Sequence, residues 1–337
     1  MKLKRKICLG IECTAHTFGV SILDFDGNVL SIVNDTYIPE TGGLHPREVR
    51  EHHLECFDKT ITIAIKQANL SMKDIDLIAF SQGPGLGPVL RVGALIVRFL
   101  SQELKIPLIG VNHCIGHIEI GRLKCGLKDP LTLYVSGGNT IISAFESESY
   151  QIFGETLDIA VGNFIDAFAR DAGLQHPGGP KIEKLAQKSK KYIPLPYIVK
   201  GMDLSFSGLY TAVKNLLKSK DYNRRYNLGD IAYSLQETAF AMLTEVTERA
   251  LAHTNKTEVL LTGGVAANKR LQEMIAYISH EHNAKYSVVP LKYAGDNGAM
   301  IGWTGILKYK EVGADNIKDT TINPKWRMDN VEIPWRS

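Results

Sequence analysis

Two histidines four residues apart, His113 and His117, have the spacing of a metal-binding pair. On a helix of 3.6 residues per turn their side chains share one face. The spacing resembles the metalloprotease pattern H-E-x-x-H, but Cys114 stands where that pattern has its water-activating glutamate, and a thiol cannot do the work of a carboxylate. The pair is therefore either a metal site of another kind or structural, and the spacing alone favours neither.

Two protein ligands rarely suffice for a metal ion, so further donors are needed. Asp296, in KYAGDNGAMIGW, is one candidate, although capping the helix that follows explains it equally well. Tyr134, directly before the segment VSGGNT, is another, and its alternative is a strand aromatic packed in the core. Two imidazoles, a carboxylate and a phenolate would form a hard donor set that favours iron over a thiolate zinc site.

Two glycine pairs follow apolar strands and are candidates for phosphate binding. They lie in VSGGNT (135–140) and TGGVAAN (262–268). Backbone amides in such turns, and the N-terminus of a following helix, donate to anions. A plain tight turn explains a single glycine pair better. Two matching turns in two units, however, indicate a phosphate or nucleotide site.

A third glycine pair, in HPGGPKIEKLA, precedes a helix expected to begin near Pro180, and proline there is ordinary for a first helical turn. Glu183, one turn further on, is a candidate to bind a ribose hydroxyl. Asp166 lies among apolar residues in the helical segment GNFIDAFARDAG. It is either solvated or bound to a specific partner, and the sequence supports both interpretations equally.

Strands alternate with helices along the chain. ICLGIECTAHTFGVSILDFDGNVL predicts a strand, a turn and a second strand that closes on a hairpin, and 131–155 repeats this plan. Helical spacing follows in 47–70 and 231–251, and two strand–turn–helix units complete the pattern. The sequence predicts an α/β fold of two related actin-like (ASKHA) lobes with a nucleotide and metal cleft between them. The expected domains are 1–128, 129–296, and a C-terminal helix and tail, 297–337, packing back on the N-terminal lobe.

The composition is that of a soluble globular protein, with 44% hydrophobic and 22% charged residues. A net charge of +3 is too small to indicate nucleic-acid binding by itself. The five cysteines form no CxxC pair, which favours reduced thiols and a cytoplasmic location. Glu12 interrupts the first apolar run, so no signal peptide is predicted, and no run approaches the ~20 apolar residues of a membrane helix.

These motifs together resemble the universal tRNA threonylcarbamoyladenosine transferases, formerly called O-sialoglycoprotein endopeptidases. The resemblance runs from Ile11 to about Trp326 and includes, in order, SQGPGLGPVLRVG, PLIGVNHCIGHIE, YVSGGNT, HPGGPKIEKLA, MDLSFSG, TGGVAAN and AGDNGAMIG. NHCIGHIE, the tyrosine before VSGG, and DAFAR resemble the archaeal and eukaryotic branch, the catalytic subunit of the KEOPS complex. One departure is Cys13, where this branch usually has a glycine.

The resemblance implies a function and a set of site residues. The implied metal ligands, usually for iron, with zinc as the alternative, are His113, His117, Tyr134 and Asp296. The implied pocket for threonylcarbamoyl-adenylate, which ATP or another adenine nucleotide could also occupy, comprises Tyr134, Val135, Ser136, Gly137, Gly138, Asp166, Gly179, Glu183 and Asn268. The implied reaction transfers threonylcarbamoyl to N6 of the adenosine at tRNA position 37, in tRNAs that read codons beginning with adenine, and releases AMP. No general base is assigned, although Glu12 and Asp166 are candidates.

The implied partners are tRNA and separate KEOPS subunits, including a small protein kinase or ATPase, since no kinase sequence follows Trp335; no membrane partner is expected. Scattered cations are candidates for tRNA contacts, although a solvated charged face explains each one better. One helix is expected to carry Lys188, Lys190 and Lys191, and the next helix is expected to carry Lys214 and Lys218. The adjacent residues Arg224 and Arg225 follow. The alternative functions are a metalloprotease, a small-molecule kinase or ATPase of the same fold, and a silent scaffold for a kinase.

Overall fold

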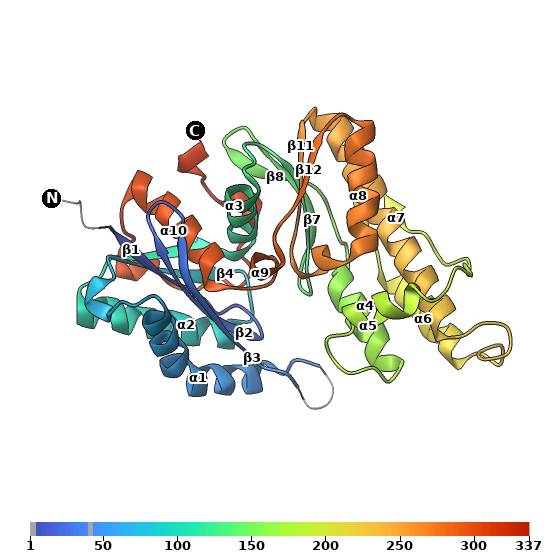
Figure 1. Cartoon of the computed structure of the whole chain (residues 1–337), viewed down its shortest axis with the longest axis horizontal. Coiled ribbons are helices and arrows are strands. Elements are labelled where there is room, and N and C mark those ends of the chain that lie inside the picture. Colours follow the sequence, from blue (N-terminus) through green and yellow to red (C-terminus); the bar gives the residue numbers. More distant parts are fainter. Residues whose placement is uncertain (1–4, 40–42, 337) are drawn as a thin grey trace. The chain divides into compact units, whose positions relative to one another are not determined.

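The computed structural model describes residues 5–39 and 43–336. The N-terminal segment, for which no signal peptide is predicted, therefore has its first four residues outside the described residues. Each half of the chain forms a five-stranded sheet (Figure 1). The strands of the first sheet are β1 (Ile7–Glu12), β2 (Thr17–Asp24), β3 (Val29–Thr36), β4 (Leu77–Gly83) and β5 (Leu108–Asn112). Those of the second are β6 (Leu131–Val135), β7 (Thr140–Glu146), β8 (Ser149–Glu155), β11 (Glu258–Thr262) and β12 (Lys285–Val288).

The two sheets share one topology. The first has the order β3-β2-β1-β4-β5, and the second, read from its hairpin edge, is β8-β7-β6-β11-β12. In each, the first strand pairs antiparallel with the second and parallel with the fourth, which pairs parallel with the fifth. The parallel pairs require crossover connections, which the helices supply. The predicted α/β class and the internal repeat are therefore confirmed.

The helices expected in 47–70 and 231–251 are present, with ends that differ by up to three residues. The helices of the first half and the C-terminal region are α1 (Pro46–Gln67), α2 (Gly87–Leu104), α3 (His113–Cys125) and α10 (Gly298–Val312). Those between them are α4 (Val161–Asp171), α5 (Gly179–Ala186), α6 (Ser207–Lys218), α7 (Leu228–Thr254), α8 (Lys269–Glu281) and α9 (Leu291–Ala294). Short elements complete the chain: η1 (Met72–Asp74), β9 (Val199–Lys200), β10 (Asp203–Leu204), η2 (Gly264–Ala267), η3 (Ile317–Asp319), η4 (Met328–Asn330) and η5 (Pro334–Arg336).

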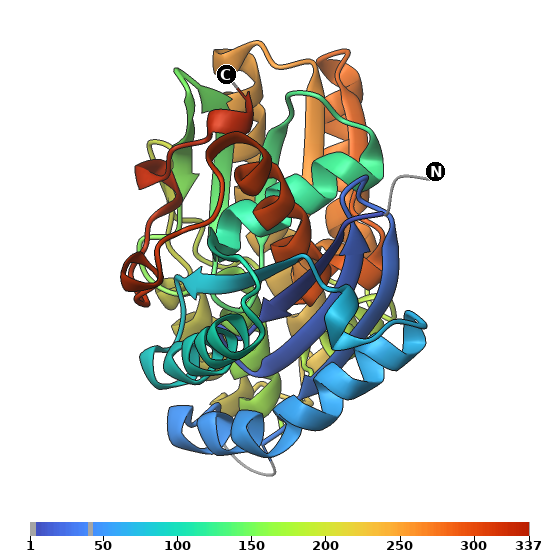
Figure 2. The same cartoon turned by 90° about the vertical axis from the view of Figure 1, so that its left-hand side faces the viewer.

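The contacts divide the described residues into two compact units. The first comprises the residues up to Leu123, Glu146–Tyr150 and the residues from Asp296 onward, and the second comprises Lys124–Phe145 and Gln151–Gly295. In the first unit α1 and α2 cover one face of the sheet and α10 covers the other (Figures 1 and 2). In the second unit α7 and α8 pack on the sheet. The domain limits given above stay a prediction.

Helix α10 reaches the first sheet through glycines. A Cβ added to Gly10 on β1 would lie only 2.1 Å from the carbonyl oxygen of Gly298, and one added to Gly298 would lie 2.3 Å from that of Gly10. No side chain larger than hydrogen fits at either position without moving the backbone. This close approach fixes the start of α10, and with it the preceding Asp296, against the middle of the sheet.

The structure confirms the prediction made for the cysteines and corrects the one made for three lysines. All five cysteines are free, as predicted. The prediction that Lys188, Lys190 and Lys191 lie in a helix is wrong, because α5 ends at Ala186, the last buried residue of its apolar stripe. Among the described residues, no helix is long and apolar enough to cross a membrane.

Candidate metal centre and glycine turns

The histidine pair lies at the start of α3. Strand β5 ends at Asn112, whose Oδ1 accepts hydrogen bonds from the backbone N–H of Cys114 (3.0 Å) and Ile115 (3.3 Å). This contact caps the helix, so that it begins at His113. The His113 and His117 rings then share a face, with their centroids 4.9 Å apart, and both side chains are buried.

Asp296 brings a carboxylate to the two rings. Its Oδ1 lies 3.2 Å from His117 Nε2 and 3.6 Å from His113 Nε2. The helix that follows is capped by the next residue, because Asn297 Oδ1 accepts from the backbone N–H of Met300 at 3.1 Å. Capping therefore does not explain Asp296.

The three residues fit a metal ion. Each offers one ligand atom, and these atoms lie within 4.8 Å of one another. Two imidazole nitrogens and a carboxylate oxygen form a donor set suited to iron or another divalent transition metal.

Glu12 stands behind the first histidine. Its Oε2 lies 3.0 Å from His113 Nδ1, while its Oε1 accepts from the backbone N–H and the hydroxyl of Thr14 at 2.8 and 2.5 Å. Glu12 is fully buried at the end of β1. A carboxylate on the distal nitrogen of a ligand histidine fixes its tautomer and its orientation. Both oxygens of Glu12 are thus engaged in holding His113 and its own turn.

The protonation of the cluster follows from its charges. Burial alone would lower the pKa of His113, but the carboxylates of Glu12 and Asp296 outweigh it and raise the pKa to about 9. Burial lowers the pKa of His117 despite its hydrogen bond with Asp296. The charge of His113 and the hydrogen bond from His117 hold the pKa of Asp296 low, against the effect of its burial. Burial raises the pKa of Cys114 to about 12, so that its thiol stays protonated.

The two glycine turns of the second unit lie side by side. Strands β6 and β11 are parallel, with Tyr134 opposite Thr262, so the turns that follow them leave the same sheet edge. Gly263 has φ +94°, and a Cβ there would lie 2.2 Å from the carbonyl oxygen of Val135. Added Cβ atoms at Gly137, Gly138 and Gly264 would meet nothing within 4 Å. The sheet therefore presents two adjoining turns with accessible backbone, as an anion site requires.

The predicted polar residues of this unit hold neighbouring backbone. Asp166 Oδ1 accepts from the N–H of Gly178 at 2.8 Å, directly before Gly179 at the start of α5. Glu183 Oε1 accepts from the N–H of Lys269 at 2.7 Å, at the start of α8. Asn268 Oδ1 caps α8 through the N–H of Arg270 at 2.9 Å. Glu183 and Asn268 thus meet at one helix terminus, whereas Asp166 holds the glycine turn before α5.

Tyr134 belongs to β6 in the second unit. Its ring is buried, and its hydroxyl oxygen lies 3.4 Å from Ser136 Oγ and 3.3 Å from Asn139 Nδ2, which donate to it. These contacts tie it to the VSGGNT turn. Its role as a metal ligand stays a prediction.

Sequence reasoning missed two residues around the metal cluster. The Thr14 hydroxyl contacts Glu12 and lies 3.3 Å from His113 Nδ1. Asn297 caps α10, so that Asp296 is not needed for that role. A hydroxyl residue two positions after a glutamate at a strand end, and an asparagine next to a candidate ligand, were the available signals.

The fold defines the class of protein. The chain resembles the HypF crystal structure from T. kodakarensis (TM-score 0.60, 18% identity, 91% of this chain and 48% of that one). It also resembles component A of the (R)-2-hydroxyglutaryl-CoA dehydratase of Acidaminococcus fermentans (TM-score 0.57, 12% identity, 90% of this chain and 99% of that one). At these identities the likeness establishes the actin-like fold alone.

The sequence assigns the family within that class. The model of the TsaD family, tRNA N6-adenosine threonylcarbamoyltransferase, matches residues 28–303. A transferase of that name from Thermococcus sibiricus is 53% identical over 98% of this chain and 100% of its own length. A "probable bifunctional tRNA threonylcarbamoyladenosine biosynthesis protein" from Methanothermobacter thermautotrophicus is 55% identical, and the chain spans 61% of its length. The chain belongs to the tRNA N6-adenosine threonylcarbamoyltransferase family.

Proposed function

We propose that this protein transfers a threonylcarbamoyl group from threonylcarbamoyl-adenylate to N6 of the adenosine at position 37 of tRNAs that read codons beginning with adenine. The observation that carries the proposal is the cluster of His113, His117 and Asp296, in a chain that belongs to this transferase family. A bond forms between N6 and the carbamoyl carbon, the bond from that carbon to the phosphate oxygen breaks, and AMP leaves with the negative charge.

A metal, proposed to be iron, would be held by the two imidazoles and the carboxylate. When bound, it supplies a fixed positive charge that orients and polarises the oxygens of the donor. The chain's own part is to keep that position rigid. Burial of both rings, the Glu12 contact to His113 Nδ1 and the glycine contact beneath α10 all serve that purpose.

The adjoining glycine turns of the second unit are proposed to bind the adenylate. Their exposed backbone is proposed to provide amide donors for a phosphate, first of all at Gly137, because the N–H of Ser136 donates to the carbonyl oxygen of Asn139 at 2.8 Å and that of Gly138 to Ser136 Oγ at 3.3 Å. Glu183 and Asn268 are proposed to face the ribose or the purine. Because the acyl-phosphate bond is already activated, positioning is the main task of these groups.

The amine of adenosine loses a proton as the new bond forms. Glu12 is a poor base for it, because both of its oxygens already accept hydrogen bonds or lie against His113. Asp166 is likewise engaged through its Oδ1. The phosphate of the leaving AMP is the acceptor we favour, because it gains charge in the same step.

The metalloprotease alternative is weakened by the same contacts. It needs a carboxylate free to activate water beside the metal, whereas Glu12 is held behind His113 and Cys114 is a buried thiol. The kinase alternative gives the cluster of His113, His117 and Asp296 no role.

The proposed partners are tRNA and separate KEOPS subunits, with a small kinase or ATPase among them. Lys214, one of the candidate cations for tRNA contact, pairs with Asp171 at 3.1 Å, which reduces its availability for a phosphate. If phosphate contacts contribute to affinity, tRNA binding should weaken as salt rises.

Reconstitution tests the proposal. The protein is incubated with tRNA, threonine, bicarbonate, ATP, an adenylate-forming enzyme and candidate partners, and the nucleosides are analysed. We expect His113→Ala and Asp296→Ala to lose the metal of this cluster and to lower modification at least a hundredfold. His280→Ala is the matched control, since its side chain is 90% exposed and far from the cluster in sequence. Native modification by both ligand variants would refute a role for the metal.

The optical spectrum tests the fourth ligand separately. Ferric iron bound by a phenolate should give a visible charge-transfer band that Tyr134→Phe abolishes. A band that persists in Tyr134→Phe would exclude Tyr134 as a ligand without affecting the three-residue cluster.

A further inference from the structure

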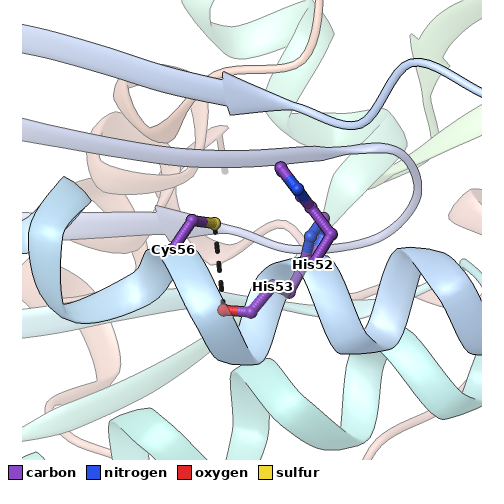
Figure 3. Close-up of side chains that lie close together, drawn as sticks. All are labelled: His52, His53 and Cys56. Atoms are coloured by element: carbon purple, nitrogen blue, oxygen red, sulfur yellow. Dashed lines mark hydrogen bonds between the residues drawn. The ribbon is translucent and has the colours of Figure 1, made fainter.

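We propose that His52, His53 and Cys56 of α1 form a second metal site, for zinc, distinct from the cluster around Asp296. Figure 3 shows the three side chains on adjoining turns of the helix. Each offers one ligand atom, and these atoms lie within 4.8 Å of one another. The site does not depend on the proposed transferase function.

The spacing suits a single ion. Cys56 follows His52 by four residues and His53 by three, the two spacings that bring side chains together on a helix. The adjacent residues His52 and His53 are brought together by the orientation of their rings, since all three ligand atoms lie within 4.8 Å of one another. The two rings are tilted by 60° with centroids 5.6 Å apart. Tetrahedral zinc with bonds of about 2.0–2.3 Å places its nitrogen and sulfur ligands about 3.5 Å apart, so small side-chain rotations close the site.

His53 points to a ligand most directly. Its side chain is fully buried, and its Nε2 lies 3.0 Å from the carbonyl oxygen of Ala15. A carbonyl can only accept, so Nε2 carries the proton and Nδ1 carries the lone pair. Nδ1 is buried and has no hydrogen-bond partner among residues 5–39 and 43–336. Buried polar atoms are nearly always satisfied, and an ion at Nδ1 would satisfy this one.

The protonation of His53 agrees with this role. Burial, with a smaller effect from the neighbouring His52, lowers its pKa to about 4. The ring is therefore neutral at pH 7 and its lone pair is available. The Ala15 carbonyl fixes the tautomer, as the backbone or carboxylate partner of a ligand histidine does in metal sites.

Cys56 provides the soft donor. It is 7% exposed, and its thiol makes a long contact, 3.8 Å, to the carbonyl oxygen of His53. Burial raises its pKa to about 11, so the free protein holds a thiol that releases its proton when a metal binds. Two imidazoles and a thiolate favour zinc over magnesium, calcium or manganese.

His52 is the most exposed of the three residues. Its side chain is 23% exposed, and its Nε2 lies 3.0 Å from Asp35 Oδ1. The site therefore lies nearest to solvent at His52. The carboxylate of Asp35, or water, would take the fourth position of a tetrahedral site.

Zinc binding to the full chain tests the proposal. Asp296→Ala removes the other centre, and this protein is stripped with a chelator, reloaded with zinc alone and analysed for metal content and by zinc X-ray absorption. We expect one zinc per chain with a sulfur ligand at about 2.3 Å. Cys56→Ser in the same background should remove the sulfur signal and weaken zinc binding at least tenfold. Cys125→Ser, a partly buried cysteine in neither cluster, is the matched control and should change neither.

His52→Ala provides a second test that leaves the buried residues in place. It should also weaken zinc binding at least tenfold, whereas His280→Ala should not. Zinc absent from Asp296→Ala, or a sulfur signal that survives Cys56→Ser, would overturn the proposal. So would equal zinc affinity in His52→Ala and His280→Ala.

Discussion

The two histidine clusters of the first unit differ in their third donor and in how the chain assembles them. The cluster of His113 and His117 gains a carboxylate from Asp296, 179 residues beyond His117. The α1 cluster of His52, His53 and Cys56 lies within two turns of one helix and gains a thiol. One set favours a hard or borderline ion such as iron, and the other favours zinc.

The difference in assembly has a structural consequence. Asp296 reaches the rings only because α10 packs on β1 through the glycine contact between Gly10 and Gly298. The first cluster is therefore formed by the folded unit as a whole. The α1 cluster needs only its helix and the contact to Ala15, so its ligands come together locally.

The pH dependence of metal affinity should separate the two clusters most strongly. The metal at the first cluster competes with the proton on His113, whose pKa is about 9, while His117 is neutral and Asp296 ionised. Affinity should rise about tenfold per pH unit well below that pKa, about fiftyfold in all from pH 7 to 9, and then level off. Zinc at the α1 cluster displaces the proton of Cys56, with a pKa of about 11, so its affinity should still rise above pH 9.

Chelator competition from pH 7 to 10 measures both slopes. Asp296→Ala isolates the α1 cluster, and Cys56→Ser isolates the first. Equal slopes above pH 9 would show that His113 is not the group that the metal displaces.

The contact behind His113 should have the next largest effect. Glu12→Gln keeps the shape of the side chain but removes the charge that orients and supports the imidazole. We expect metal affinity at the first cluster to fall 10- to 100-fold, the range for partners of a ligand histidine. The zinc affinity of the α1 cluster should stay unchanged. Asp26→Asn, an exposed carboxylate on a hairpin turn, is the control, and an equal loss in this variant would indicate a general charge effect.

The first cluster also shows how far the sequence can lead. The spacing of His113 and His117 predicted that the two side chains share one face of a helix, and Asp296 was already a candidate ligand that the family resemblance then selected. Local pattern could not decide between Asp296 and Asn297 as the helix cap, because both side chains suit that position. The contact between Glu12 and His113 could not be predicted either. Strand β1 ends at Glu12 and strand β5 precedes His113, and both strands pair with β4, which lies between them.

The fold was easier to predict than the site because repeated patterns determine it. Glycine turns after apolar strands placed both sheets, and their parallel pairing then placed VSGG beside TGG. The α1 cluster was missed for the opposite reason. The segment EHHLEC lies in a helix whose apolar spacing accounts for Phe57 and Ile61, so its polar residues drew no attention. A cysteine four residues after one histidine and three after the next was the available signal.

The smallest expected effect is a coupling between the two clusters. His53 Nε2 holds the carbonyl of Ala15, and the adjoining Thr14 contacts both Glu12 and His113. A metal that fixes His53 therefore restrains the turn that supports His113. The path runs through one backbone contact, so we expect a change in affinity of about two- to fivefold, at or below the lower end of usual couplings. Co²⁺ titration, followed by the thiolate charge-transfer band of Cys56, would compare protein preloaded with iron at the first cluster with Asp296→Ala. Identical Co²⁺ affinities would contradict the coupling. By reciprocity, any difference must appear as the same factor in the affinity of the first cluster.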